Sequence, residues 1–228
     1  MTNIQVLAFP YACGSLDSYS KLCHIDGIDL IKYELPGRRS RISEKLDSLN
    51  SVMIEVCNVI NFNSPYVIFC HSMGGYLANE LCRFIEINKL HKPRKVIISG
   101  QCPVDNNNDS LEEYNELSLD NTKTYISLFN GTPQEIINNK ELMEFYGEIF
   151  YQDMQFINQY KMNNSSKKVK SNVEVWYSDQ DIHVKEENIM KWKDYAVNSC
   201  NFKKFKGDHF FINNIFQDPK LTFELLCC

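Results

Sequence analysis

Short runs of β-branched and apolar residues recur along the chain, and longer segments with helical spacing of apolar residues lie between several of them. The runs predict strands at Ile4–Phe9, Leu30–Leu35, Tyr66–Cys70, Lys95–Ser99, Val173–Tyr177 and, more weakly, Asn201–Phe205. The longer segments include Met73–Ile87 and Lys185–Val197, which we predict to be helices. Strands that alternate with helices predict an α/β fold with a mainly parallel central sheet flanked by helices.

The alternation stops between about residues 105 and 162, where three helix-like segments follow one another without a convincing strand. We predict that 105–162 is a helical insertion within a single domain of residues 1–228. Its last helix, Glu141–Tyr160, carries a wide apolar stripe that includes Phe150 and Met154. Such a stripe is typical of core packing, but in an insertion between strands it also suits a lid over an active site. Both interpretations stand at this point.

Composition and charge narrow the classes of function. The 24 basic and 29 acidic residues give a net charge of −5, which argues against broad binding to nucleic acid or to an anionic membrane. No apolar run reaches the ~18 residues of a membrane span. The first residues lack the pattern of a secretory signal and the nine cysteines are odd in number, so we expect a cytoplasmic protein. Cys23 and His24 are adjacent rather than spaced as ligands, and we expect no metal site.

The segment FCHSMGG, residues 69–75, places a serine where a predicted buried strand turns into a predicted helix. A nucleophile elbow needs this context, because its tight turn requires small residues two positions before and after the serine. Those positions hold Cys70 and Gly74, and the common pattern has glycine at the first of them. Ser72 is the candidate nucleophile, although serines beside glycines also occur in ordinary turns and helix caps.

A serine nucleophile needs a base and a carboxylate that orients the base, and both follow in the chain order Ser, Asp, His. The segment SDQDIHV comes after the predicted strand that ends at Tyr177 and offers Asp181, three residues before Val184, with Asp179 as its rival. His209, in KGDHFFI after the last predicted strand, is the candidate base. The alternative for the two carboxylates is that both are solvated turn residues.

An oxyanion hole takes one backbone N–H from the residue after the nucleophile and one from the loop after an early strand. We assign the first to Met73. We assign the second to Ala12, in the loop FPYACGS that follows the first predicted strand. The alternative for this loop is an ordinary strand-to-helix turn.

Six blocks, in the order FPYACGS, ELPGRRSRISE, FCHSMGG, NGTPQEIINNKELMEFY, YSDQDIHV and GDHFFI, resemble those of type II thioesterases. These are the stand-alone α/β-hydrolase thioesterases that accompany nonribosomal peptide and polyketide synthases. The resemblance implies an α/β-hydrolase fold with the insertion as a helical lid, and hydrolysis of acyl groups from the phosphopantetheine arm of carrier proteins, which removes stalled or misprimed units. It implies a triad of Ser72, Asp181 and His209, an oxyanion hole at Ala12 and Met73, and no cofactor of the enzyme's own.

The chain departs from the family pattern at three positions. Cys13 and Cys70 stand where glycines are usual, and Ser178 occupies a glycine position before the acid loop. The departure at Cys13 bears most on the geometry of the oxyanion donor.

The expected partner is an acyl-loaded carrier protein, with no nucleic acid or membrane involved, and a monomer is the default. The segment PGRRSR, with Arg38, Arg39 and Arg41, is interpreted either as a solvated basic turn or as a contact for an acidic carrier protein or its phosphate. A general carboxylesterase or acyltransferase on small or lipid esters would use the same triad. A binding protein with an impaired site would keep only the fold.

Overall fold

The computed structural model describes residues 3–46, 48–103, 118, 121–128, 131–163 and 168–228. Within these residues six parallel strands form one sheet in the order β2-β1-β3-β4-β5-β6. The strands are β1 (Ile4–Phe9), β2 (Ile28–Leu30), β3 (Tyr66–His71), β4 (Val96–Ser99), β5 (Asn172–Ser178) and β6 (Ser199–Phe205). The predicted α/β fold with a mainly parallel sheet is confirmed.

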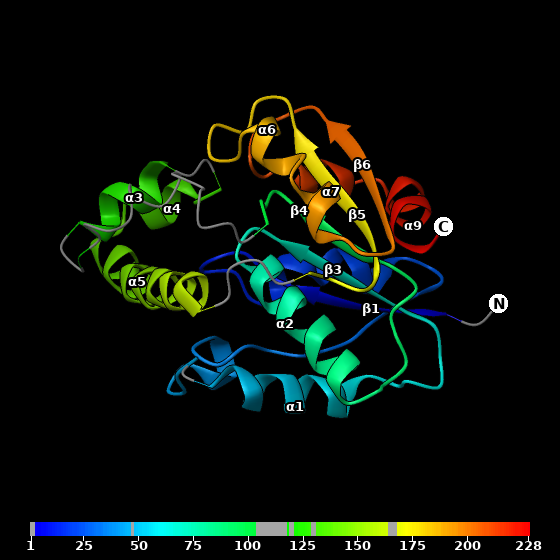
Figure 1. Ribbon diagram of the computed structural model, residues 1–228. Helices are drawn as coiled ribbons and strands as arrows, with labels where there is room; N and C mark the ends of the chain where they lie inside the picture. Colours follow the sequence, from blue (N-terminus) through cyan, green and yellow to red (C-terminus); the bar gives the residue numbers. More distant parts are fainter. Residues whose placement is uncertain (1–2, 47, 104–117, 119–120, 129–130, 164–167) are drawn as a thin grey trace.

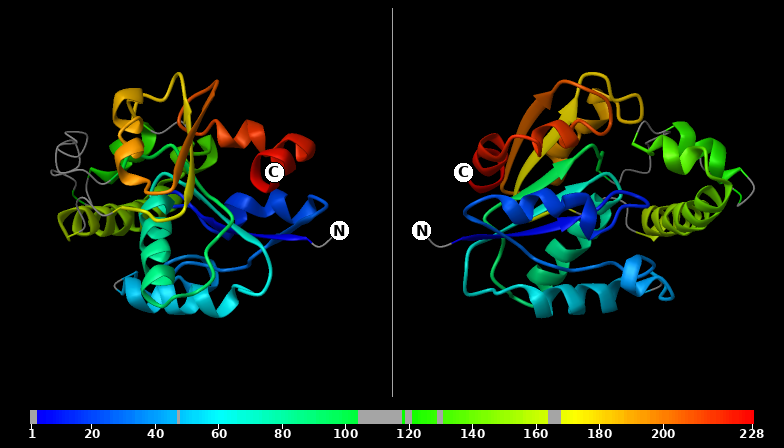
Figure 2. Two further views of the ribbon diagram at one scale, coloured as in Figure 1. Left: turned by 45° about the vertical axis from the view of Figure 1, so that its right-hand side comes forward. Right: turned by 180° about the vertical axis from the view of Figure 1, so that it is seen from behind.

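Helices cover both faces of this sheet (Figures 1 and 2). The helices that precede the insertion are η1 (Leu16–His24), η2 (Arg39–Arg41), α1 (Leu49–Val59) and α2 (Gly74–Ile87). Those that follow it are α6 (Glu186–Ile189), α7 (Trp192–Tyr195), α8 (Ile212–Ile215) and α9 (Pro219–Cys227). Side chains of α1, α2, α6 and α7 belong to one hydrophobic cluster, and those of η1, α8 and α9 belong to a second cluster on the opposite face.

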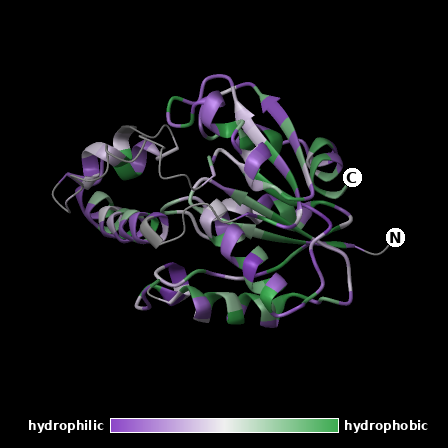
Figure 3. Ribbon diagram, in the orientation of Figure 1, coloured by the Kyte–Doolittle hydropathy of each residue, from purple (hydrophilic) through white to green (hydrophobic). Residues whose placement is uncertain are grey.

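The central strands are apolar on both sides because both faces are covered. In β3, Ile68 and Cys70 point into the first cluster, whereas Val67 and Phe69 point into the second, and all four are at most 1% exposed. Figure 3 shows the same contrast, since β1 and β3 are mostly hydrophobic and the edge strand β6 is partly hydrophilic. The sheet therefore forms a rigid platform whose central strands are fixed from both sides.

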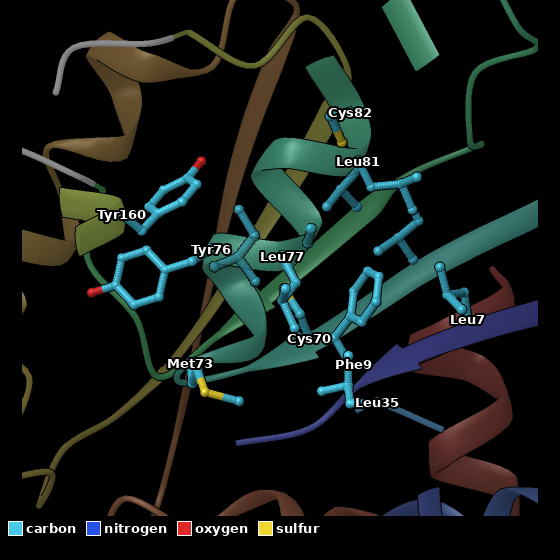
Figure 4. Packing of buried hydrophobic residues seen from close by; sticks show 14 of the residues in the cluster. Leu7, Phe9, Leu35, Cys70, Met73, Tyr76, Leu77, Leu81, Cys82 and Tyr160 are labelled. Carbon is cyan, nitrogen blue, oxygen red and sulfur yellow. The ribbon is translucent and has the colours of Figure 1, made fainter. Parts of the chain in front are cut away.

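Helix α2 packs directly on this platform (Figure 4). Leu77 and Leu81 are fully buried in the same cluster as Phe9 of β1 and Cys70 of β3. Burying side chains of this size contributes about 1.5–3 kcal/mol each. The start of α2, which follows the serine, is thus fixed against the sheet.

Two predicted elements differ from the structure. The predicted strand Leu30–Leu35 is wrong in its bounds, because pairing with β1 covers Ile28–Leu30 and ends after Ile31 donates to the carbonyl of Val6 at 2.9 Å. Leu35 is buried in the core, so its apolar character reflects packing and not strand pairing. The predicted helix Lys185–Val197 is divided into α6 and α7 and ends early, since Ala196 pairs with Val169 instead.

Among the residues described between β4 and β5, in the stretch for which a helical insertion is predicted, the structure has three helices. They are α3 (Thr122–Leu128), α4 (Gln134–Ile137) and α5 (Lys140–Asn163). Figure 1 shows them grouped together at one side of the sheet, away from the two chain ends. Most of the acidic segment 105–120 lies outside the described residues. Along the described part of the chain, no helix is both long and apolar enough to cross a membrane.

Part of the apolar stripe of α5 lines a cavity, and part packs against α2. Phe150 and Met154 face a cavity described below, whereas Tyr160 packs against Tyr76 of α2 with ring centroids 5.5 Å apart (Figure 4). The stripe is narrower than its apolar residues suggest, because Leu142 and Phe145 are 39% and 45% exposed.

Candidate active site

Ser72 lies at the sharp turn between β3 and α2. Its φ of +51° is a left-handed conformation that non-glycine residues rarely adopt, as a nucleophile elbow requires. Gly74 lets the helix approach β1, because a Cβ there would lie 2.4 Å from the carbonyl oxygen of Phe9. At the other small position, the buried Cys70 fits within the strand and its thiol donates to the carbonyl of Ile97 at 3.2 Å. Cysteine is therefore accommodated where glycine is usual.

His209 and Asp181 are brought together at the carboxyl end of the sheet. The His209 Nδ1 lies 2.7 Å from Asp181 Oδ2, and the two side chains are 5% and 1% exposed. The other oxygen, Oδ1, accepts the backbone N–H groups of His183 at 2.9 Å and Val184 at 3.2 Å. These bonds fix the carboxylate, and a proton on Nδ1 donated to it leaves Nε2 as the basic nitrogen of the neutral ring.

Asp179 lies apart from this pair. It is exposed, and its Oδ1 accepts the backbone N–H of Gly207 at 3.3 Å across the turn that leads to His209. The structure therefore brings Asp181, and not its rival, to the histidine. Ser178, at the third departure from the family pattern, donates its hydroxyl to the carbonyl of Asp208 at 3.0 Å and so joins the acid loop to the histidine loop.

His71 is a buried neighbour of the site that the sequence analysis did not single out. Its Nδ1 lies 2.9 Å from the Ser99 hydroxyl, and its ring centroid is 4.8 Å from that of His209. Complete burial, together with His209, holds the pKa of His71 well below its usual range. His71 is thus neutral and places no positive charge beside His209.

The loop after β1 forms a turn in which the Gly14 N–H donates to the carbonyl of Tyr11 at 2.8 Å. Ala12 and Cys13 are the central residues of this turn, and Cys13 has a φ of +63° that glycine would adopt at lower cost. Within the described residues, the backbone N–H groups of Ala12 and Met73 donate to no other group. Both predicted oxyanion donors are therefore available to donate a hydrogen bond to a bound oxygen atom.

A cavity of about 250 Å³ opens between the sheet and the helices of the insertion. Ser72, His209 and Ala12 line it together. The apolar part of its wall comes from α3, α4 and α5, through Ile126, Ile136, Tyr146, Phe150 and Met154. The candidate nucleophile and an apolar wall thus line the same cavity.

Phe210, next to His209, joins the insertion to the rest of the site. Its ring packs edge-on against Tyr11 with centroids 4.9 Å apart. Gly131 lies against the same ring, because a Cβ at Gly131 would come within 2.2 Å of Phe210 Cε2. Tyr11, Gly131 and Phe210 all line the cavity.

Of the arginines in PGRRSR, only Arg39 fits the solvated basic turn of one interpretation, because it is exposed and pairs with the exposed Asp17 at 3.1 Å. Arg38 is 3% exposed, and its guanidinium contacts Asp153 of α5 at 2.5 Å. Arg41 forms ion pairs with Glu44 and Glu55 at 2.5 and 2.7 Å. The interpretation is wrong for Arg38 because an intramolecular carboxylate, 115 residues away in the chain, pairs with it. Asp153 lies four residues from both Ile149 and Ile157, so a carboxylate within the apolar stripe was the signal for this pair.

No group of three or more metal-ligating side chains occurs among the residues that the structure describes. Of the predicted site residues, Ser72, Ala12 and His209 line the cavity, Asp181 is hydrogen-bonded to His209, and Met73 follows Ser72 at the elbow.

Comparison with known proteins identifies the class to which this fold and site belong. The chain matches the family described as "Thioesterase domain" over residues 4–222. It therefore belongs to the thioesterase domain family, on a fold of the α/β-hydrolase type, and is a hydrolase acting on thioesters.

Individual relatives are similar over nearly the whole chain. The medium-chain S-acyl fatty acid synthase thioesterase of Homo sapiens is 27% identical over 222 residues, which cover 92% of this chain and 81% of that protein. The gramicidin S biosynthesis protein GrsT of Aneurinibacillus migulanus is 23% identical over 234 residues, 99% of this chain and 88% of the relative.

Among solved structures, ClbQ from the colibactin NRPS/PKS pathway superposes with a TM-score of 0.84 at 24% identity, covering 98% of this chain and 96% of that chain. YbtT, the type II thioesterase from the yersiniabactin NRPS/PKS biosynthetic pathway, has a TM-score of 0.77 at 19% identity, covering 98% and 91%. Structural neighbours of this chain are thus type II thioesterases of such pathways.

Proposed function

We propose that this thioesterase removes acyl groups from the phosphopantetheine arm of carrier proteins in a peptide or polyketide synthase, and so regenerates misprimed carriers. The observation that carries the proposal is the cavity in which Ser72 and His209 meet an apolar wall, with Asp181 bonded to His209. The likeness to GrsT, ClbQ and YbtT supports a synthase carrier protein as the partner.

In the proposed reaction the Ser72 hydroxyl oxygen attacks the thioester carbonyl carbon while His209 Nε2 takes its proton. The carbonyl oxygen becomes negatively charged and accepts hydrogen bonds from the N–H groups of Ala12 and Met73. The C–S bond then breaks, and the thiol leaves with the proton from the imidazolium. Since a thiol has a pKa of about 8.5, it leaves with less acid assistance than an alcohol.

The second half of the reaction uses the same groups in reverse order. His209 takes a proton from water, whose oxygen attacks the carbonyl carbon of the acyl-serine. The tetrahedral intermediate collapses, the C–O bond to Ser72 breaks, and the serine oxygen recovers its proton from His209. A carboxylic acid is released. Asp181 holds the ring in place and stabilises the imidazolium in both halves.

The test compares two substrates that carry the same acyl group, an acetyl-loaded carrier protein and acetyl-N-acetylcysteamine. We expect kcat/KM for the carrier to exceed that for the small thioester by about tenfold or more, because protein contacts beyond the arm contribute roughly 1.4 kcal/mol or more. Unloaded carrier is added to the small-thioester reaction as the control for non-specific effects of the protein.

Equal kcat/KM for the two substrates would contradict carrier recognition. An oxoester of the same acyl group is assayed as a third substrate. If it is cleaved in preference to both thioesters, the enzyme is a general esterase and the proposal fails. If the wild-type protein turns over none of them, the site is impaired and the proposal fails.

A further inference from the structure

Arg38 and Asp153 form an ion pair that lies outside the proposed triad. Their side chains are 4% and 1% exposed. Arg38 comes from the loop before η2, and Asp153 from the middle of α5 in the insertion. An ion pair this deeply buried is unusual, and removing one partner leaves the other charge buried without a counter-charge. The pair therefore joins two distant parts of the chain in a fixed geometry.

Both members of the pair also hold the loop that carries Ala12. Asp153 Oδ2 accepts the backbone N–H of Cys13 at 2.8 Å, and the Arg38 Nε–H donates to the carbonyl of Gly14 at 3.1 Å. A further guanidinium N–H of Arg38 donates to the carbonyl of Pro36 at 3.2 Å, which fixes the guanidinium itself. The peptide N–H directly after Ala12 and the carbonyl of Gly14 are thus both held by side chains from outside the turn.

The turn needs this support because its conformation is costly for the residue present. Cys13 has the positive φ that glycine would adopt at no steric cost. Its thiol is a donor to the carbonyl of Tyr146 at 3.5 Å, also on α5, and burial, with Asp153 nearby, raises the pKa of that thiol so that it stays protonated. Helix α5 therefore holds Cys13 through both the backbone and the side chain.

We propose that Arg38 and Asp153 are positioning residues that hold the Ala12 N–H where the oxyanion develops, and that they couple α5 to the oxyanion hole. The proposal rests on the function proposed above. Phe150 and Met154 of the same helix line the cavity. An acyl group that contacts this wall thus contacts α5, the same helix that holds the Ala12 loop through Asp153.

The test removes the pair in two ways. Asp153→Asn keeps an acceptor for the Cys13 N–H but leaves Arg38 without its counter-charge. The double variant Arg38→Met with Asp153→Leu replaces the pair by apolar side chains of similar size, which buried ion pairs often tolerate without loss of folding. Glu86→Gln is the matched control, because Glu86 lies in the last turn of α2, far along the helix from Ser72, and pairs with Lys170 at 2.5 Å.

The readouts separate positioning from structural support. For each variant kcat and KM are measured on acetyl-N-acetylcysteamine, together with inhibition by an alkyl trifluoromethyl ketone, whose adduct with a serine places an oxyanion in the hole. Loss of one oxyanion donor costs about 10²–10³-fold in kcat. We expect the double variant to be folded by circular dichroism, to lose about 10²-fold in kcat, to keep KM within about threefold, and to bind the ketone about 10²-fold more weakly. Asp153→Asn should change in the same direction, and Glu86→Gln should match the wild type.

A folded double variant with wild-type kcat and ketone affinity would overturn the proposal. So would a rise in KM alone, which would assign the pair to substrate binding, or a lower melting temperature with unchanged kcat, which would assign it to stability. Failure of the proposed function is a separate result, because it would appear as wild-type turnover that Ser72→Ala does not abolish.

Discussion

Replacing Ser72 with alanine is expected to lower kcat on a small acyl thioester by about 10⁶-fold, the loss typical of removing a triad nucleophile. The variant keeps a Cβ at the same strained φ, so the elbow and the packing of α2 are retained. Without the hydroxyl no acyl-serine forms, and only the residual effect of binding and of the oxyanion donors remains. The measurement is thiol release followed with a chromogenic disulfide.

The control for this variant is Ser51→Ala, which removes an exposed hydroxyl on α1. We expect wild-type turnover for the control and the same melting temperature for all three proteins. Turnover by Ser72→Ala within about tenfold of the wild type would show that another group attacks the thioester, and the proposed mechanism would be abandoned.

Replacing Asp181 with asparagine is expected to lower kcat by about 10⁴-fold. Asparagine still accepts the backbone N–H groups of His183 and Val184, so the loop is kept. Asparagine has no negative charge to stabilise the imidazolium of His209, and its amide favours the wrong tautomer of the ring.

Asp179→Asn is the matched variant, since the two carboxylates lie two residues apart on the same loop. We expect it to retain kcat within about threefold, because its carboxylate is exposed and bonds to the turn at Gly207, whereas His209 is paired with Asp181. A large loss for Asp179→Asn together with a small one for Asp181→Asn would assign the orienting role to Asp179 and contradict the geometry.

The strands and the nucleophile elbow could be predicted from the sequence because their signals are local. β1 has the predicted bounds, and β3 and β4 differ from the prediction by a single residue. The turn at Ser72 is encoded by small residues at fixed offsets, and the acid and base loops follow strands at the edge where the carboxyl ends meet. Chain order and strand ends were enough to select these residues.

The features that the sequence did not predict depend on contacts between distant segments. The burial of Arg38 follows from Asp153, which is 115 residues away, and local composition indicated a solvated turn instead. β2 is short because pairing with β1 ends after Ile31, whereas the apolar run continues into the core to Leu35. Local sequence does not show which distant groups will meet. The ion pair with Asp153 decides the burial of Arg38, and strand pairing with β1 decides the length of β2.

The two cysteines at glycine positions have different consequences. Cys70 lies in an extended strand, where its side chain fits the core and its thiol bonds to Ile97. Cys13 has a positive φ, which costs a non-glycine residue roughly 1–2 kcal/mol, and it is held by Asp153 and Tyr146. The departure at Cys13 is thus matched by contacts from α5, and neither cysteine removes a group that the proposed mechanism uses.

The proposed mechanism depends most on Ser72 being the group that carries the acyl chain. Titration with a fluorophosphonate tests this directly, with thioesterase activity and the site of modification followed in the same samples by thiol release and peptide mass spectrometry. We expect one label per chain, on Ser72, and loss of activity in proportion to labelling. Activity that survives complete labelling of Ser72, or a loss of activity that follows modification of another residue, would contradict it.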